Sequence, residues 1–204
     1  VNVYNDANYT DPDVPYGQTW INAPYTDGTA NYLREVTFKA WWTGLMIQEQ
    51  QSCLEKMVLF WHNHFSTEIL EIGYARYAYI NNALIRNRAL GNFKTLVKEI
   101  TLDPAMLNYL NGQYNTKTAP DENYARELQE LFTLGKGPNS QYTEDDVKAA
   151  ARVLTGYRIN GQAQGFFDST RHDTTNKQFS SFFGNTIIGG KSGAAGATEL
   201  DELL

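Results

Sequence analysis

The chain has 204 residues, with 17 basic and 23 acidic side chains and a formal net charge of −6. Because no basic stripe is present to neutralise phosphates, nucleic acid is not expected as the main partner. The lone Cys53 excludes an internal disulfide and a cysteine-based zinc cluster. No apolar run approaches the ~20 residues that span a bilayer. The chain starts without Met and closes on ATELDELL, so we expect a fragment of a longer protein.

The first 28 residues differ in composition from the rest of the chain. They hold no Lys or Arg, but several prolines, tyrosines and a tryptophan, and no helical or alternating period persists. We predict that residues 1–28 form an irregular aromatic arm, ordered by docking on a helical body. A ligand-facing aromatic platform, for example for sugar, is the alternative, although aromatic side chains mostly serve packing.

Residues 29–156 are predicted to form a helical core domain, because apolar residues recur at helical spacing between start and stop signals. Ser52 with Glu55 predicts a capping box, Asp103 precedes a proline at the first helical position, and Asn92 and Thr143 predict two further N-caps. The helix 52–65 is apolar nearly all round, which is typical of a central helix. The expected helices cover residues 29–50, 52–65, 74–90, 92–100, 103–110, 121–135 and 143–156.

After Tyr157 the chain becomes rich in Gly, Ser, Thr and Asn. Asn160-Gly161 is a hairpin turn signal between YRI and GFF. We predict a loop-rich β annex at residues 157–196, followed by the start of a truncated helix at 197–204. The fold class is therefore mainly α, an irregular multi-helix bundle with a small loop-rich β element near the C-terminus.

The segment 121–135 contains the most informative polar residue. At about 100° per residue, Glu127 points between Leu131 and Leu134, inside the apolar stripe, and Glu130 lies at its edge. The stripe is predicted to hold Tyr124, Leu128, Leu131, Phe132 and Leu134. A carboxylate aimed into a core is costly unless it is paired, protonated or bound to a cation. Glu127 could pair with a buried arginine such as Arg152 or Arg76, or the two glutamates at i, i+3 could help to bind a metal.

His62 and His64 end the second predicted helix. Residues two apart on a helix point to different faces, so they cannot chelate one ion unless that helix ends at Trp61. The two interpretations are a pair of hydrogen-bonded histidines at a buried helix terminus and a functional role near neutral pH.

His172 and Asp173 lie in the loop-rich segment, where loops on a rigid scaffold often carry function. With His62 or His64 and Glu127 they would make a mixed set that suits Zn²⁺, Mn²⁺ or Fe²⁺. Alternatively, Asp173 forms an Asx turn with its own backbone and Lys177 is solvated.

Several blocks of the chain resemble the bacterial "domain of unknown function 1800" family, namely EKMVLFWHNHF, LGNFKTLVKEITLDPAMLNYL, ENYARELQELFTLG, YTEDDVKAAARVLTGY and the HD-x-x-x-K element at His172. The resemblance covers roughly Trp41 to Gly184, in order. Members of the family are longer and many are exported, which implies a periplasmic or extracellular location. The resemblance supplies a fold expectation and a residue list, but no reaction.

Two classes of function are compatible with these features. The first is an exported module without catalysis, which binds a partner protein or a polysaccharide through its aromatic arm while the polar residues act as an internal brace. The alternative is a metal-dependent or acid–base hydrolase-like enzyme with a His and carboxylate cleft. Its predicted catalytic residues are Glu127, His64 and His172. Its predicted metal ligands are His62, His64, Glu127, Glu130, His172 and Asp173.

Overall fold

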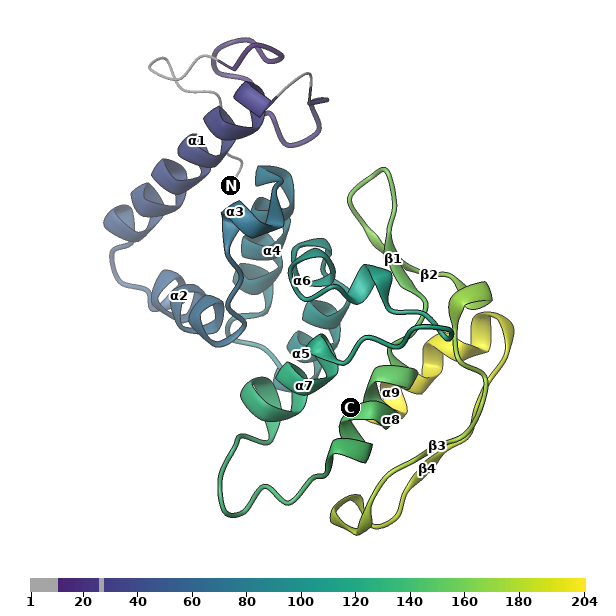
Figure 1. Cartoon of the computed structure of the whole chain (residues 1–204). Coiled ribbons are helices and arrows are strands. Elements are labelled where there is room, and N and C mark those ends of the chain that lie inside the picture. Colours follow the sequence, from purple (N-terminus) through teal and green to yellow (C-terminus); the bar gives the residue numbers. More distant parts are fainter. Residues whose placement is uncertain (1–10, 26–27) are drawn as a thin grey trace. The chain divides into compact units, whose positions relative to one another are not determined.

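The computed structural model describes residues 11–25 and 28–204, which are mainly α-helical with short antiparallel strands late in the chain (Figure 1). The predicted fold class is confirmed. The chain divides into two compact units, Val1–Gly91 (unit 1) and Asn92–Leu204 (unit 2). This division falls inside the segment 29–156, which the sequence pattern predicts as one domain. Residues 1–10, the first part of the predicted arm, lie outside the described residues, as do 26 and 27.

The described residues of unit 1 form four helices, and α4 contacts each of the other three. These helices are α1 (Gly28–Gln48), α2 (Leu54–His64), α3 (Ile69–Ile72) and α4 (Ala75–Arg88). Its interior is formed by side chains that are almost completely buried: Ala30, Val58, Phe65, Ile72, Ala75 and Ile85.

The described part of the arm, residues 11–25, docks on α1. Trp20 is buried, and its Nε1 donates a hydrogen bond to Oγ1 of Thr37 at 2.9 Å. Arg34 is also fully buried, and its Nε donates to Asp11 at 2.6 Å while its guanidinium lies 4.4 Å from the ring centre of Tyr25. A buried charge needs such a partner, so this ion pair fixes the arm to the first turns of the helix.

The start of α2 corrects two predictions. Cys53 is the N-cap and makes no side-chain cap, and Glu55 instead accepts two hydrogen bonds from Arg86 of α4, at 2.6 and 2.8 Å. The predicted capping box of Ser52 and Glu55 is therefore wrong, because a bidentate guanidinium partner outweighs a backbone amide. Phe60 is 54% exposed, so α2 is not the central helix that its apolar composition predicts.

The first part of unit 2 is helical, and three of its helices begin at capping side chains. The helices of this part are α5 (Phe93–Thr101), α6 (Pro104–Tyr109), η1 (Gly112–Tyr114), α7 (Asn123–Glu127), η2 (Leu128–Thr133) and α8 (Glu144–Val153). Asn92 accepts a hydrogen bond from the amide of Thr95, and Asp103 accepts two at the start of α6. Thr143 forms a reciprocal capping box with Asp146. These three predicted caps are confirmed.

The last part of unit 2 alternates short strands with 3₁₀ turns. β1 (Tyr157–Ile159) pairs antiparallel with β2 (Gly165–Phe167) around the predicted Asn160-Gly161 turn. β3 (Lys177–Gln178) pairs antiparallel with β4 (Ile187–Ile188). The remaining elements are η3 (Ser169–Arg171), η4 (Ser181–Phe183), η5 (Gly193–Thr198) and α9 (Glu199–Leu203). Among the described residues, no helix has both the length and the hydropathy that crossing a membrane requires.

Candidate functional site

The segment that carries Glu127 starts as an α-helix and continues as the π-helix η2. The amide of Leu134 donates to the carbonyl of Gln129, five residues earlier, at 3.0 Å. A π-turn holds more residues than an α-turn, so it rotates the subsequent side chains away from the α-helical pattern. As a result Leu131 and Leu134 are 58% and 40% exposed, whereas Gln129 is buried. The prediction of one amphipathic α-helix over 121–135 is wrong in this part.

This change of helix type also changes the surroundings of Glu127, which is half-buried rather than enclosed in a core. Partial burial, followed by the nearby charge of Glu130, raises the pKa of its carboxyl above the ordinary value. Glu130 itself pairs with the exposed Lys136 at 2.7 Å. In the described part of the chain, no hydrogen bond or ion pair joins the carboxylate of Glu127 to another residue. An arginine brace for this residue is therefore absent there, since Arg152 pairs with Asp173.

The HD-x-x-x-K element folds into a buried ionic cluster. Lys177 and Glu199 are both fully buried, and Nζ of Lys177 lies 2.5 Å from Oε2 of Glu199. The Lys177 ammonium also donates to the backbone carbonyl of Asp173. On the other carboxylate oxygen, Oε1, Glu199 accepts a hydrogen bond from the backbone amide of Lys191 at 2.7 Å. The expectation that Lys177 is solvated is wrong, because α9 supplies a buried carboxylate that the distant sequence does not reveal.

His172 lies in the same cluster and is 1% exposed. Its Nε2 is 3.1 Å from Oε1 of Glu199, outside hydrogen-bond geometry. Its Nδ1 faces the carbonyl and the hydroxyl of Thr155 at 3.0 and 3.2 Å. Both ring nitrogens therefore face protein groups, which favours a structural part for this histidine.

The backbone around His172 is packed against the ring. A Cβ at Gly196 would lie 2.7 Å from Cδ2 of His172 and 2.9 Å from the ring of Phe167, so glycine is needed for this close approach. Gly156 has a positive φ of 94° and also lies against His172. Main chain therefore packs against the ring at Gly196 and against the Cβ of His172 at Gly156.

Asp173 forms the predicted Asx turn and also binds Arg152, a partner that the sequence pattern does not assign to it. Its Oδ1 accepts a hydrogen bond from the amide of Thr175 at 2.8 Å, which is the predicted Asx turn. Its Oδ2 accepts one from Nε of Arg152 on α8, also at 2.8 Å. Burial alone raises the pKa of this carboxyl, but the hydrogen bonds from Arg152 and Thr175 outweigh burial and lower the pKa to about 2.

The predicted metal ligands are not gathered into a recognisable ligand set. In residues 11–25 and 28–204, no group of three or more His, Cys, Asp or Glu side chains is placed to hold a metal ion. A zinc, manganese or iron site therefore stays a prediction from the sequence. The same holds for catalytic roles of Glu127, His64 and His172.

The two histidines of α2 have different surroundings, as their spacing predicts. The helix continues to His64, whose ring packs against Phe65 with centroids 4.6 Å apart. His62 packs edge-on against Trp42 of α1, with centroids 4.9 Å apart. Burial lowers the pKa of the His62 imidazole, which is therefore neutral near pH 7. Its Nδ1 is buried and has no hydrogen-bond partner among the described residues.

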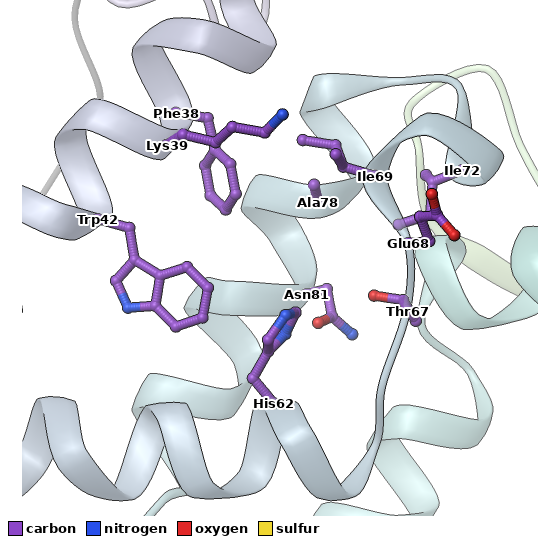
Figure 2. Close-up of a pocket in the computed structure, with 10 residues that line it drawn as sticks. All are labelled: Phe38, Lys39, Trp42, His62, Thr67, Glu68, Ile69, Ile72, Ala78 and Asn81. Atoms are coloured by element: carbon purple, nitrogen blue, oxygen red, sulfur yellow. The ribbon is translucent and has the colours of Figure 1, made fainter.

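His62 lines a cleft of about 290 Å³ that lies entirely within unit 1 (Figure 2). The lining comes from α1, α2, α3, α4 and the segment before α3: Phe38, Lys39, Trp42, His62, Thr67, Glu68, Ile69, Ile72, Ala78 and Asn81. In Figure 2 the polar side chains of His62, Asn81 and Thr67 are drawn at one end, whereas Phe38, Ile69 and Ala78 lie at the other. Lys39 and Glu68 are exposed at the surface. The cleft is therefore an apolar hollow with a polar end.

Sequence reasoning singled out His62 but missed its partners in the cleft. Trp42 and Asn81 are separated by 39 positions and share no motif, so nothing local connects them. Sequence reasoning also missed Glu199, the buried partner of Lys177. One sequence signal points to Glu199, which lies early in the predicted helix 197–204 and directly before the apolar Leu200. The structure buries Leu200.

Comparison with known proteins places this geometry in context. A family model described as "Protein of unknown function (DUF1800)" matches residues 15–204. No curated protein and no solved structure gives a significant match. The family description names no ligand and no reaction.

Proposed function

Because the chain belongs to the DUF1800 family, whose description assigns no activity, we propose from its own geometry that it is a binding module and that the cleft beside His62 is its recognition site. The observation that carries the proposal is a hollow of about 290 Å³ lined largely by apolar side chains, with the side chains of His62 and Asn81 at one end. A few polar groups in an apolar cleft are typical of ligand sites.

The size and walls of the cleft indicate what enters it. About 290 Å³ lies near the lower end of the range for ligand pockets. The rings of Phe38 and Trp42, with centroids 6.2 Å apart, form one wall. We infer that the cleft receives one ring-sized apolar group rather than an extended chain.

The proposal also covers the kind of molecule that carries this apolar group and where that molecule is found. We propose that a partner protein in the periplasm or the extracellular space supplies this apolar group, rather than a polysaccharide, whose rings carry hydroxyls. The net charge of −6 supports a partner that is not a polyanion.

The proposal is tested by titrating toluene into the ¹⁵N-labelled full chain and recording amide and indole shifts. Toluene is expected to shift resonances of residues that line the cleft. The variant Ile69→Trp fills the cleft from a half-buried position and should abolish these shifts. The matched control Leu70→Trp changes the neighbouring residue, which is 67% exposed and does not line the cleft, and should keep them. Shifts that persist in Ile69→Trp, or none in the parent chain, would contradict the proposal.

A second candidate function, an acid–base or metal-dependent hydrolase, is favoured by one observation. Glu127 carries a carboxyl with a raised pKa at the start of a π-helix, and π-turns often occur at functional sites. Elemental analysis of the purified chain for zinc, manganese and iron, together with a p-nitrophenyl ester assay, tests this candidate. A hydrolytic rate that Glu127→Gln removes would support it, and equal rates for both proteins would contradict it.

A further inference from the structure

The tripeptide Asn-Gly-Gln occurs twice in the chain, at residues 111–113 and 160–162. An asparagine before a glycine is open to attack on its side-chain amide by the main-chain nitrogen that follows, because glycine places no Cβ beside that nitrogen. Since the two tripeptides are identical, the local sequence gives both asparagines closely similar reactivity. A difference between them in the folded chain therefore has a structural cause.

Asn160 opens the loop that joins β1 to β2. Its side-chain Oδ1 accepts hydrogen bonds from the main-chain amides of Gln162 and Gln164, at 2.9 and 3.0 Å. The bond to the amide two residues ahead is an Asx turn, which folds the carboxamide back along the main chain of Gly161. The two donors also withdraw electron density from the carboxamide carbon, Cγ, as donors do in an oxyanion hole. Cγ is therefore held close to the nitrogen of Gly161 and made more electrophilic.

The attacking nitrogen is equally accessible. Gly161 is exposed, and no atom lies within 4 Å of the position that a Cβ would take. Its amide donates no hydrogen bond to another group in the described part of the chain. Water therefore reaches this N–H, and no protein acceptor has to be given up when the nitrogen attacks.

The second copy of the tripeptide is arranged differently. Asn111 has a left-handed backbone with a φ of 61°, and its side chain makes no cap hydrogen bond at the start of η1. No amide among residues 11–25 and 28–204 donates to its carboxamide. Gly112 is also more confined, because a Cβ there would lie 3.0 Å from Cδ2 of Leu107. The features that activate Asn160 are thus missing from Asn111.

We propose that Asn160 is a site of spontaneous deamidation and that Asn111 is spared while the chain is folded. The nitrogen of Gly161 forms a bond to Cγ of Asn160 as the bond from Cγ to Nδ2 breaks, and ammonia leaves with the proton of the glycine amide. Water then opens the resulting succinimide ring at either carbonyl. The product is aspartate or isoaspartate at position 160, and water is the only reagent consumed.

The two products change the hairpin in different ways. Aspartate keeps acceptor oxygens for the amides of Gln162 and Gln164, so the loop persists with one more negative charge. Isoaspartate transfers one carbon from the side chain to the main chain. This lengthens the connection between β1 and β2 and disturbs their register.

The test incubates the full chain at mildly alkaline pH, once folded and once in urea, and follows both asparagines by peptide mapping with mass spectrometry. In the folded chain we expect Asn160 to convert about 10-fold faster than Asn111. This is less than the roughly 10²–10³-fold effect of one oxyanion donor in an enclosed site, because the loop is open to water. In urea the two rates should become equal, since the tripeptides are identical.

A pair of variants tests the attacking nitrogen. Gly161→Ala should slow conversion of Asn160 several-fold, because the new methyl group crowds that nitrogen although the loop has room for it. The matched control Gly189→Ala, at a glycine with equally open surroundings, should leave the rate unchanged.

Three outcomes would overturn the inference: equal rates for the two asparagines in the folded chain, a rate difference that persists in urea, or a rate at Asn160 that Gly161→Ala leaves unaltered. The loop lies in unit 2 and the cleft beside His62 lies in unit 1. The result is therefore independent of the proposed recognition site.

Discussion

Replacing Lys177 by Met removes one partner of a fully buried ion pair. Glu199 would keep a buried carboxylate with only the amide of Lys191 and the nearby His172 ring. Breaking a buried pair on one side typically costs about 3–5 kcal/mol, because an uncompensated charge stays in the interior. We therefore expect Lys177→Met to lower the free energy of unfolding of unit 2 by about this amount.

The assay is urea unfolding followed through the amide NMR resonances of unit 2, so that unit 1 does not enter the measurement. With a urea slope of about 1–3 kcal/mol per molar for a small domain, the midpoint should fall by roughly 2 M. The double variant Lys177→Met/Glu199→Gln should recover most of the loss, since it removes both charges.

The matched control is Lys191→Met. Its ammonium contacts Thr198 and Glu202 at the surface, with 34% of the lysine side chain exposed. Surface ion pairs contribute about 0–1 kcal/mol, so this variant should unfold close to the parent chain. If Lys177→Met unfolds within about 1 kcal/mol of the parent, or the double variant is less stable than the single one, the structural account of the cluster is refuted.

Three further predictions concern unit 2. Gly196→Ala should destabilise the unit by about 1–3 kcal/mol in urea unfolding, because its Cβ would overlap an imidazole ring; Gly189→Ala, with no atom within 4 Å, should not. The pKa of Asp173 is lowered to about 2, so its carboxylate contributes stability above the unfolded pKa of about 4, which is lost as pH falls toward 2. Asp173→Asn should therefore give a shallower acid dependence, and an unchanged slope would refute this. Glu127→Gln should not lower the melting temperature, because a raised carboxyl pKa means that the charged form is disfavoured in the fold; a large decrease would restore the brace interpretation.

Local signals account for the parts of the fold that the sequence predicts correctly. Asn92, Asp103 and Thr143 each cap a helix with their own side chain, so the start of each helix is encoded within three residues. The hairpin at Asn160-Gly161 is equally local.

The failures have tertiary or geometric causes. The sequence pattern assigns Glu55 to a local cap, but Arg86, 31 residues away, binds its carboxylate. The π-helix at η2 cannot be recognised from a period of 3.6 residues, and it turns Leu131 outward. The candidate site shows the same limit, because His62 is conspicuous in sequence while the cleft exists only where separate segments of unit 1 converge.

The central claim is that the cleft of unit 1 is a recognition site, and intermolecular NOEs to a bound ring test it most directly. With toluene in excess over the ¹⁵N,¹³C-labelled full chain, we predict NOEs from the ring protons to the side chains of Trp42, Ile69 and Ala78. NOEs confined to unit 2, or the absence of NOEs from the toluene ring to these side chains, would contradict the account.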